Sequence, residues 1–323
     1  MGCSSSIDQR ANVIHSNLTS LPNHVRPSTP PVENRSSNKF RFKFDQRVLQ
    51  KYHIEALIGQ GSFSKVVRAR HRLTKVEYAI KIVSRPENES SGSINKILPS
   101  DNLTREPSSE KLCETELRVL RRVRHRNIIQ LVEVFESGIP NQRVYLVMEL
   151  CKGGELFDRI VEHGPMLELP GARAISQILD GVKYLHNLAI VHRDLKLENI
   201  LYCHSDPNNK RLVITDFGLA KINARPGDRM HTTCGTPEYI APELLKRIPY
   251  TRSVDSWAVG VVSFAVLAGM MPFEDDDRIE LYRKILHGNL AWDEEAWQGI
   301  SGRARDFVKK MLTVDENLQK IKI

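Results

Sequence analysis

The spacing of apolar residues divides the chain into a strand-rich first part and a helix-rich second part. From Tyr52, short apolar runs rich in β-branched residues recur between turns, as in ALIGQGSFSKVVRARH and EYAIKIV, and they predict successive strands. VYLVMEL is typical of a further strand. Beyond it, helical patterns such as ARAISQILDGVKYLHNL alternate with short loops that carry His, Asp and Asn. The pattern predicts a β-rich start followed by a mostly helical remainder.

Two stretches lack this apolar pattern. Residues 1 to about 38 are rich in Ser, Asn and Pro, with too few apolar residues to form a core, and predict a disordered arm. Residues 84–110 have loop composition and read as an insert before the helical run CETELRVLRRV, in which Leu117, Leu120 and Val123 share one face. We set the domain boundary between an arm of residues 1–51 and a folded domain of residues 52–323.

The longest apolar run, WAVGVVSFAVLAGMM, falls short of the ~20 residues that a membrane span needs and predicts a buried core helix. The residues after Met1 are polar, so we expect no secretory signal. The cysteines lack CxxC or Cys/His ligand spacing, which favours free thiols in a reducing compartment and argues against structural zinc. They are Cys3, Cys113, Cys151, Cys203 and Cys234.

Lys and Arg number 47 against 39 Asp and Glu, which leaves a net charge of +8. Two basic clusters stand out, KFRFKFDQR at residues 39–47 and RVLRRVRHR at residues 118–126. A nucleic-acid surface is one interpretation, but no nucleic-acid module signature accompanies either cluster. For the second cluster a solvated helix face is favoured, and we expect no nucleic-acid partner.

The first chemical motif is GQGSFSKV at residues 59–66, where small residues between two strands let backbone amides approach phosphates. Alone, this motif fits an ordinary hairpin turn equally well. Lys81 in YAIK lies on a following strand, where its cation could neutralise phosphate charge. Glu116 on the next helix is the best carboxylate to hold it.

The strongest signal is VHRDLKLENIL followed by TDFGLAK. Phosphoryl transfer needs a carboxylate near the acceptor hydroxyl, a cation on the transferred phosphate, and oxygen ligands for Mg²⁺. Asp194, Lys196, Asn199 and Asp216 supply these groups, and CGTPEYIAPE closes the segment at Glu243.

With these motifs in this order, residues 52 to about 315 resemble a eukaryotic protein kinase of the calmodulin-kinase-like group. The runs FDQRVLQKYHIEALIGQGSFSKVVRARHR, CETELRVLRRVRHRNIIQLVEVFE and MPFEDDDR are similar to the protein serine kinase H family. The resemblance implies a two-lobed α+β fold, with an N-lobe at 52–150 and a C-lobe at 151–323. It also implies ATP and Mg²⁺ as cofactors and protein substrates with Ser or Thr acceptors. It does not establish binding of calmodulin or another calcium sensor.

The resemblance also implies residue roles. Asp194 would accept the proton of the acceptor hydroxyl, and Lys196 in DLKxEN marks Ser/Thr specificity. Asn199 and Asp216 would bind Mg²⁺, while Lys81, paired with Glu116, would contact the phosphates. The residues expected to bind the nucleotide are Gly59, Gln60, Gly61, Ser62, Phe63, Ser64, Lys65, Val66, Ala79, Lys81, Glu149, Cys151, Glu155 and Leu201. Met148 would stand as gatekeeper beside them.

Glu155 and Glu198 resemble an acidic pair that faces an arginine about three residues before the acceptor, although both acids could serve only ATP and local structure. His192, Phe217, Leu120 and Val134 match residues whose stacking links the two lobes, anchored by Asp255. Under the simpler interpretation each of these is an ordinary core residue.

Thr232 matches an activation-loop phosphosite whose phosphate would pair with Arg193. Thr236 is expected to support Asp194 and Lys196 instead of acting as a switch.

The start of the chain, MGCSSS, fits an N-myristoylation motif at Gly2. One myristoyl chain binds membranes only marginally, so palmitoylation of Cys3 and the KFRFKF stretch would supply the second signal. The alternative is an unmodified arm. The expected location is the cytoplasmic side of Golgi, endoplasmic reticulum or plasma membranes and the cytoplasm, and the nucleus is left open as an alternative.

The chain departs from the family pattern at Ser64, which replaces a loop glycine, and in the insert before Glu116. Near Gln319 the family has an arginine that pairs with the glutamate at Glu243, so we expect Glu243 to lack that partner and the C-lobe to be incomplete at its end. A kinase-like scaffold without turnover is therefore the alternative to an active Ser/Thr kinase.

Overall fold

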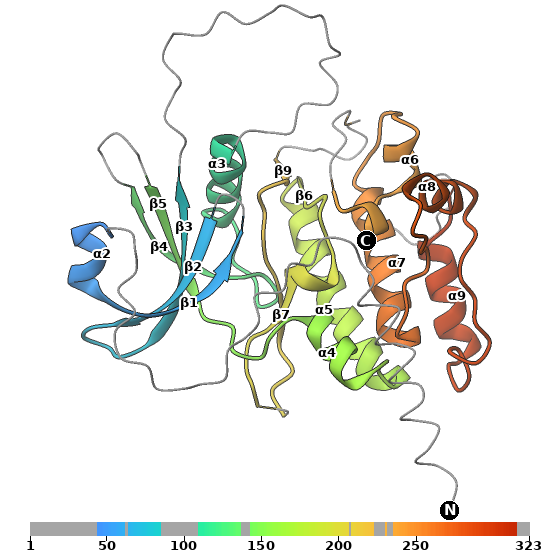
Figure 1. Ribbon diagram of the computed structural model, residues 1–323, viewed down its shortest axis with the longest axis horizontal. Helices are drawn as coiled ribbons and strands as arrows, with labels where there is room; N and C mark the ends of the chain where they lie inside the picture. The colour runs from blue at the N-terminus through green and yellow to red at the C-terminus, as the bar shows by residue number, and fades with distance from the viewer. Residues whose placement is uncertain are drawn as a thin grey trace, which may run out of the picture.

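The computed structural model describes residues 44–61, 64–84, 109–136, 143–206, 208–222, 230 and 235–314. The predictions for Gly2, Cys3, Ser62, Phe63, Thr232 and Gln319, for the arm up to residue 43 and for most of the insert lie outside these residues. Within them the chain forms two lobes, a sheet with one large helix and a helical bundle, placed side by side in Figure 1. This is the expected α+β architecture.

The N-lobe is built on an antiparallel sheet in the order β1-β2-β3-β5-β4. Its strands are β1 (Tyr52–Gln60), β2 (Ser64–His71), β3 (Glu77–Ser84), β4 (Leu131–Glu136) and β5 (Arg143–Glu149). Helix α3 (Ser109–Leu120) lies beside β3 and buries Leu117 and Leu120. The helix begins within the predicted insert and includes its last two residues, and its apolar face packs against the sheet.

The folded N-lobe extends further toward the N-terminus than the boundary at residue 52. Asp45 caps helix α2 (Gln46–Lys51) by accepting a hydrogen bond from the Arg47 amide at 2.8 Å. Phe44 and Val48 are buried in a cluster with residues of the sheet, among them Tyr145. Assigning residues 44–51 to the arm was therefore wrong, and the end of the basic-aromatic stretch belongs to the N-lobe core.

The C-lobe is mainly helical. Its helices are α4 (Leu156–His163), α5 (Glu168–Asn187), α6 (Pro242–Leu245), α7 (Ser253–Ala268), α8 (Arg278–His287) and α9 (Gly302–Met311), with 3-10 turns η1 (Leu197–Asn199) and η2 (Pro237–Tyr239). Two short ladders, β6 (Ile190–Val191) with β9 (Lys221–Ile222) and β7 (Ile200–Tyr202) with β8 (Leu212–Ile214), lie toward the N-lobe.

Helix α7 is the centre of the C-lobe, and all of its residues after Ser253 are buried. This confirms the expected core helix in the longest apolar run. Within the described part of the chain, no helix is both long and apolar enough to span a membrane. One buried cluster runs from α3 and β5 through α5 to α7 and α9, so the two lobes share a continuous core.

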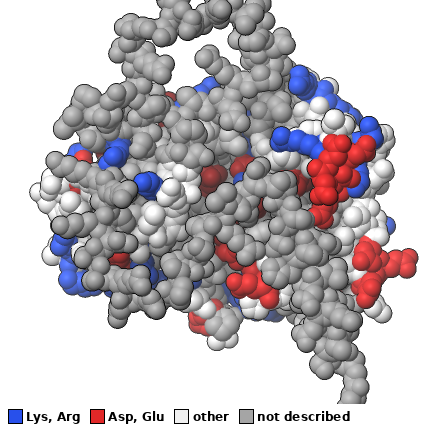
Figure 2. All heavy atoms as spheres, viewed as in Figure 1, with Lys and Arg blue, Asp and Glu red and all other residues white. Residues whose placement is uncertain are grey.

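Charge is mixed on the face shown in Figure 2, where acidic side chains gather over the C-lobe side with basic groups beside them. The second basic cluster divides as its helical pattern predicts, because Arg118, Arg121 and Arg122 are exposed while Val119, Leu120 and Val123 are buried. This supports the interpretation of a solvated helix face.

Candidate active site

Lys81 and Glu116 form the predicted ion pair between the N-lobe sheet and α3. The Lys81 Nζ atom lies 2.8 Å from each Glu116 carboxylate oxygen and 3.4 Å from Asp216 Oδ1. Burial opposes the charged form of Lys81, but Glu116 and Asp216 outweigh it and raise the lysine pKa above its usual value. The long insert before α3 does not prevent Glu116 from reaching Lys81.

Asp216 stands where the two lobes meet. It has a φ of +61°, in the left-handed region that a residue with a Cβ seldom adopts. Burial disfavours its ionised form, yet Lys81 lowers the pKa of this carboxyl below its ordinary value. Asp216 is therefore a carboxylate at neutral pH, as an oxygen ligand for a hard cation must be.

Asp194 is held by three neighbouring side chains. Thr236 Oγ1 donates to Asp194 Oδ1 at 3.0 Å, and Lys196 Nζ donates to the same Thr236 oxygen at 3.0 Å. Asn199 Nδ2 donates to the Asp194 carbonyl at 2.8 Å and to Oδ2 at 3.2 Å. Lys196 Nζ also lies 3.5 Å from Asp194 Oδ2. The expected support of Asp194 by Thr236 is present, and the four side chains form one network.

The loop that carries Asp194 is anchored on Asp255 of α7. This fully buried carboxylate accepts the backbone amides of His192 and Arg193, each at 2.9 Å, and lies 2.8 Å from His186 Nε2. The His192 ring meets the Phe217 ring edge-on, with centroids 5.0 Å apart. The predicted anchor and the predicted stacking contact between His192 and Phe217 are both confirmed.

Arg193 makes contacts that the sequence did not indicate. Its Nε atom donates to the Leu219 carbonyl at 2.7 Å and its Nη1 atom to the Tyr250 hydroxyl at 3.1 Å. Its φ of +68° lies in the left-handed region. The guanidinium thus joins the segment after Asp216 to Tyr250, while its predicted phosphate partner, Thr232, lies outside the described residues.

Several of the residues expected around a nucleotide base lie on strands of the N-lobe sheet and on β7. Gly59 pairs with Val66 across the first hairpin, and Ala79 pairs with Met148 across β3 and β5. Gln60 pairs with Lys65, and the Gly61 amide donates to the Ser64 carbonyl at 2.8 Å. Leu201 on β7 forms an isolated bridge with Glu155 on the C-lobe side.

The segment after β5 packs tightly on β7. The amides of Lys152 and Gly153 donate to the carbonyls of Cys203 and Tyr202 at 3.1 and 3.0 Å. A Cβ on Gly153 would clash with Tyr202 and with the carbonyl oxygen of His204. Cys151 Sγ lies 3.9 Å from Cys203 Sγ. The segment that joins the lobes is thereby fixed to the C-lobe.

The Glu149 side chain makes a structural contact. Its side chain binds Arg211 through two hydrogen bonds of 2.9 and 3.0 Å and accepts the Gln130 amide at 2.9 Å. The carboxylate is therefore committed to a structural contact, and only the backbone of Glu149 is left to contact a nucleotide. Sequence reasoning missed this ion pair because its partners are 62 residues apart.

Glu155 and Glu198 lie close enough to influence one another electrostatically. Burial, followed by the charges of Asp158 and Glu198, raises the pKa of Glu155 to about 7, with Lys196 opposing the shift. Tyr239 donates from its hydroxyl to Glu198 Oε2 at 3.4 Å. Together the two acids place negative charge beside Lys196.

Glu243, at the end of the motif segment, is buried and accepts a hydrogen bond from Ser253 Oγ at 3.2 Å. Its expected partner position near Gln319 lies outside the described residues. Ser64, the other departure from the motif pattern, lies on β2 and pairs with Val83, so it fits the sheet without a break.

Comparison with known proteins agrees with this geometry. The family model for the protein kinase domain matches residues 52–319. Serine/threonine-protein kinase H1 from Bos taurus is 51% identical over 298 residues, which cover 92% of this chain and 65% of that protein. Human calcium/calmodulin-dependent protein kinase type 1B is 41% identical over 273 residues, which cover 84% of this chain and 73% of that protein. The chain spans just under two thirds of the length of the H1 relatives. On the match of the family model to most of its length, the chain belongs to the protein kinase domain family.

Proposed function

We propose that the chain is a protein serine/threonine kinase that transfers the γ-phosphate of ATP, with Mg²⁺, to Ser or Thr hydroxyls of protein substrates. The observation that carries the proposal is that the structure brings together two groups of side chains, one that could bind the nucleotide phosphates and one around Asp194. Lys81 is paired with Glu116 and close to Asp216, while Asp194 is held by Lys196, Asn199 and Thr236. The names of the serine/threonine-protein kinase H1 relatives agree with this activity.

The residues present fit a magnesium nucleotide. Asp216 is ionised and Asn199 is a buried amide, and these are oxygen donors of the kind that Mg²⁺ prefers. Bound Mg²⁺ would neutralise the phosphate oxygens of ATP. The Lys81 cation would add a second positive charge, held in place by Glu116.

Side chains around Asp194 would orient the acceptor hydroxyl and stabilise the transferred phosphate. Asp194 Oδ1 already accepts a hydrogen bond from Thr236, which fixes the plane of the carboxylate. Its Oδ2 would orient the acceptor hydroxyl and take up its proton. Lys196, 3.5 Å from Oδ2, would stabilise the negative charge that develops on the transferred phosphate. Water has no part in this step, because the acceptor is a protein hydroxyl.

Substrate choice would come from Glu155 and Glu198. Their negative charge favours an acceptor segment with Arg about three residues before the Ser or Thr. Asp158 adds to this potential, because it raises the Glu155 pKa as a like charge does. The peptide that best reports activity therefore contains this Arg.

The scaffold alternative rested on the insert before α3 and, more seriously, on an expected lack of a partner for Glu243 and an incomplete end of the C-lobe. The pair between Lys81 and Glu116 argues against the first ground, since the insert does not displace the helix. The second ground concerns the region near Gln319, which lies outside the described residues.

Membrane attachment through myristoylated Gly2 and palmitoylated Cys3 is part of the proposal, and the MGCSSS motif supports it. It would place the kinase on the cytoplasmic side of membranes. Gly2→Ala should move the protein from the membrane to the soluble fraction of cells, whereas an unchanged membrane fraction would contradict the anchor.

The activity is tested by incubating the chain with labelled Mg²⁺-ATP and a Ser peptide containing this Arg. We expect label on the Ser peptide, none on its Ala counterpart, and none after chelation of Mg²⁺. Lys81→Met should abolish transfer while the protein stays folded by circular dichroism. Label transfer that survives Lys81→Met, or none from folded native chain, would contradict the proposal.

A further inference from the structure

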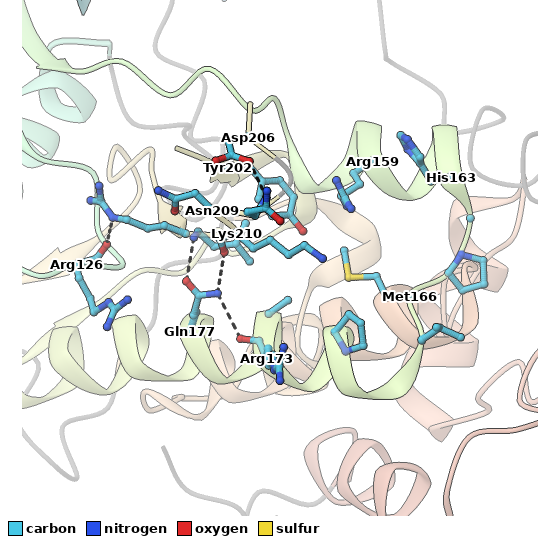
Figure 3. Close-up of a pocket in the computed structure, with 18 residues that line it drawn as sticks. Arg126, Arg159, His163, Met166, Arg173, Gln177, Tyr202, Asp206, Asn209 and Lys210 are labelled. Carbon is cyan, nitrogen blue, oxygen red and sulfur yellow. Dashed lines mark hydrogen bonds between the residues drawn. The ribbon is translucent and has the colours of Figure 1, made fainter. Parts of the chain in front are cut away.

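A cavity of about 840 Å³ opens on the C-lobe away from the candidate active site. It lies between α4, the start of α5 and the loop from β7 to β8 (Figure 3). Its lining includes none of the residues assigned to nucleotide, Mg²⁺ or phosphoryl transfer. Tyr202 contributes to its wall, whereas the preceding residue, Leu201, belongs to the predicted nucleotide site. The cavity is therefore separated from that site by the thickness of β7.

The lining of this cavity is strongly basic. Arg126, Arg159, Arg173 and Lys210 all contribute to it, and within the described residues none of them has a carboxylate at ion-pair distance. Lys210 extends along the cavity toward Met166 (Figure 3). Asp206 is an acidic member of the lining, and its side chain already accepts the Asn208 amide at 2.8 Å. The cavity thus carries an excess of uncompensated positive charge.

Hydrogen bonds fix the cavity walls. Gln177 donates to the carbonyls of Lys210 and Arg173 at 3.0 and 3.4 Å, and it accepts the Leu212 amide at 3.0 Å. Gln177 therefore joins α5 to the loop between β7 and β8. Arg211 Nε donates to the Arg126 carbonyl at 2.7 Å on the far side. A ligand would meet a preformed site and would not need to order it.

Apolar groups lie among these cations. Pro165, Met166 and Leu167 form one end of the cavity, and Leu167 is 80% exposed. The Arg159 guanidinium lies over the Tyr202 ring, 5.3 Å from its centroid. Because Arg159 covers that ring, Tyr202 is not open for a nucleic-acid base to stack on it. Side chains of mixed charge and apolar character fit better.

We propose that this cavity is a docking site for an acidic segment of the protein substrate, in which an apolar side chain lies among carboxylates. The inference rests on the proposed kinase function. The volume is within the range of sites that bind ligands of a few residues. Carboxylates would pair with Arg173 and Lys210, and the apolar side chain would contact Met166 and Leu167. The substrate would then carry a basic segment at the acceptor, facing Glu155, and an acidic segment elsewhere.

Direct binding tests the site. A fluorescein-labelled peptide of alternating Glu and Leu is titrated with the full chain, and anisotropy is compared with that of a Gln and Leu peptide. We expect only the Glu peptide to bind and the affinity to fall with added salt. The double variant Arg173→Glu with Lys210→Glu should weaken binding by about tenfold or more.

The matched control places the same charge changes at two exposed basic residues outside the cavity, Lys183→Glu with Arg303→Glu. It should bind like the native chain, and thermal melts should show that both double variants fold. Equal binding of the Gln peptide, equal binding by the cavity variant, or equal loss in the control would overturn the proposal. An oligouridylate that binds more tightly than the Glu peptide, and loses binding in the cavity variant alone, would also overturn it by indicating a nucleic-acid partner.

Phosphorylation separates this inference from the kinase proposal. A short Ser peptide is compared with the same peptide joined by a flexible linker to the acidic segment. We expect the acidic segment to lower KM for the native chain but not for the cavity variant, with kcat/KM for the short peptide unchanged. If both peptides are phosphorylated with the same KM, the docking site is wrong and the kinase stands. If the acidic peptide binds as expected but neither peptide is phosphorylated, the kinase proposal fails while the cavity site stands.

Discussion

The preference for Arg before the acceptor should depend on pH through Glu155. Its pKa is raised to about 7 by burial and by the neighbouring charges of Asp158 and Glu198. Only the ionised carboxylate attracts a guanidinium. For one group with this pKa, the ionised fraction is about 0.9 at pH 8 and about 0.1 at pH 6. The attraction is therefore lost as the pH falls through 7.

The magnitude follows from these fractions. kcat/KM reports the ionisation of the free enzyme, so the advantage of an Arg peptide over its Ala counterpart should fall between pH 8 and pH 6, by up to about tenfold when Glu155 supplies most of that advantage. The ratio of the two values is the quantity to measure, because groups that act on both peptides cancel. Initial rates at saturating ATP give it directly.

Two variants sharpen the test. Glu155→Gln should show a low ratio at every pH, close to that of the native chain at pH 6. Glu162→Gln, at an exposed acid on helix α4, which begins directly after Glu155, should keep the native profile. A ratio that stays constant from pH 6 to pH 8 in the native chain, or one that still titrates in Glu155→Gln, would refute the assignment of Glu155.

Three further outcomes follow from single contacts. Thr236→Val removes the hydrogen bond that Thr236 donates to Asp194 and should lower kcat by about 10- to 100-fold with little change in KM for ATP, while Thr236→Ser retains activity. Asp255→Asn should lower the free energy of unfolding by about 3–5 kcal/mol in urea titrations. Burial opposes ionisation of Asp255, but its hydrogen bonds to His186 and to the loop amides outweigh burial and lower its pKa below the usual value for Asp. The stabilisation by this carboxylate is therefore complete above the usual Asp pKa and is lost as the pH falls through the lowered pKa. The variant should not show this loss. Phe44→Ala should cost about 3 kcal/mol; an unchanged unfolding midpoint would return residues 44–51 to the arm.

Much of the site could be predicted because its groups are fixed by short motifs. Asp194, Lys196 and Asn199 lie within one loop, and Asp216 follows in a second motif. The pair of Lys81 with Glu116 was predictable because the strand and the helix each show their own periodicity. Such local patterns also predicted the strands and helices of both lobes, including the buried helix α7.

Contacts between residues far apart in the sequence could not be predicted from such local patterns. The binding of Arg211 to Glu149 depends on how the two lobes pack, and the anchoring of Arg193 on Tyr250 depends on how distant segments of the C-lobe pack. The N-lobe boundary was misplaced although a local signal existed. Asp45 is a good N-cap, and Val48 follows it at helical spacing from Phe44. The basic residues around these positions suggested a membrane contact and hid the amphipathic turn.

The most direct test of the proposed mechanism is a single-turnover measurement of phosphate transfer at saturating Mg²⁺-ATP, comparing the native chain with Asp194→Asn. Nucleotide binding by both proteins is measured in parallel. We expect the native chain to phosphorylate the Ser peptide, and the variant to bind nucleotide equally well but transfer phosphate at least about 1,000-fold more slowly. Transfer at a similar rate by both proteins would contradict the role of Asp194, and no transfer by a folded native chain that binds ATP would contradict the kinase itself.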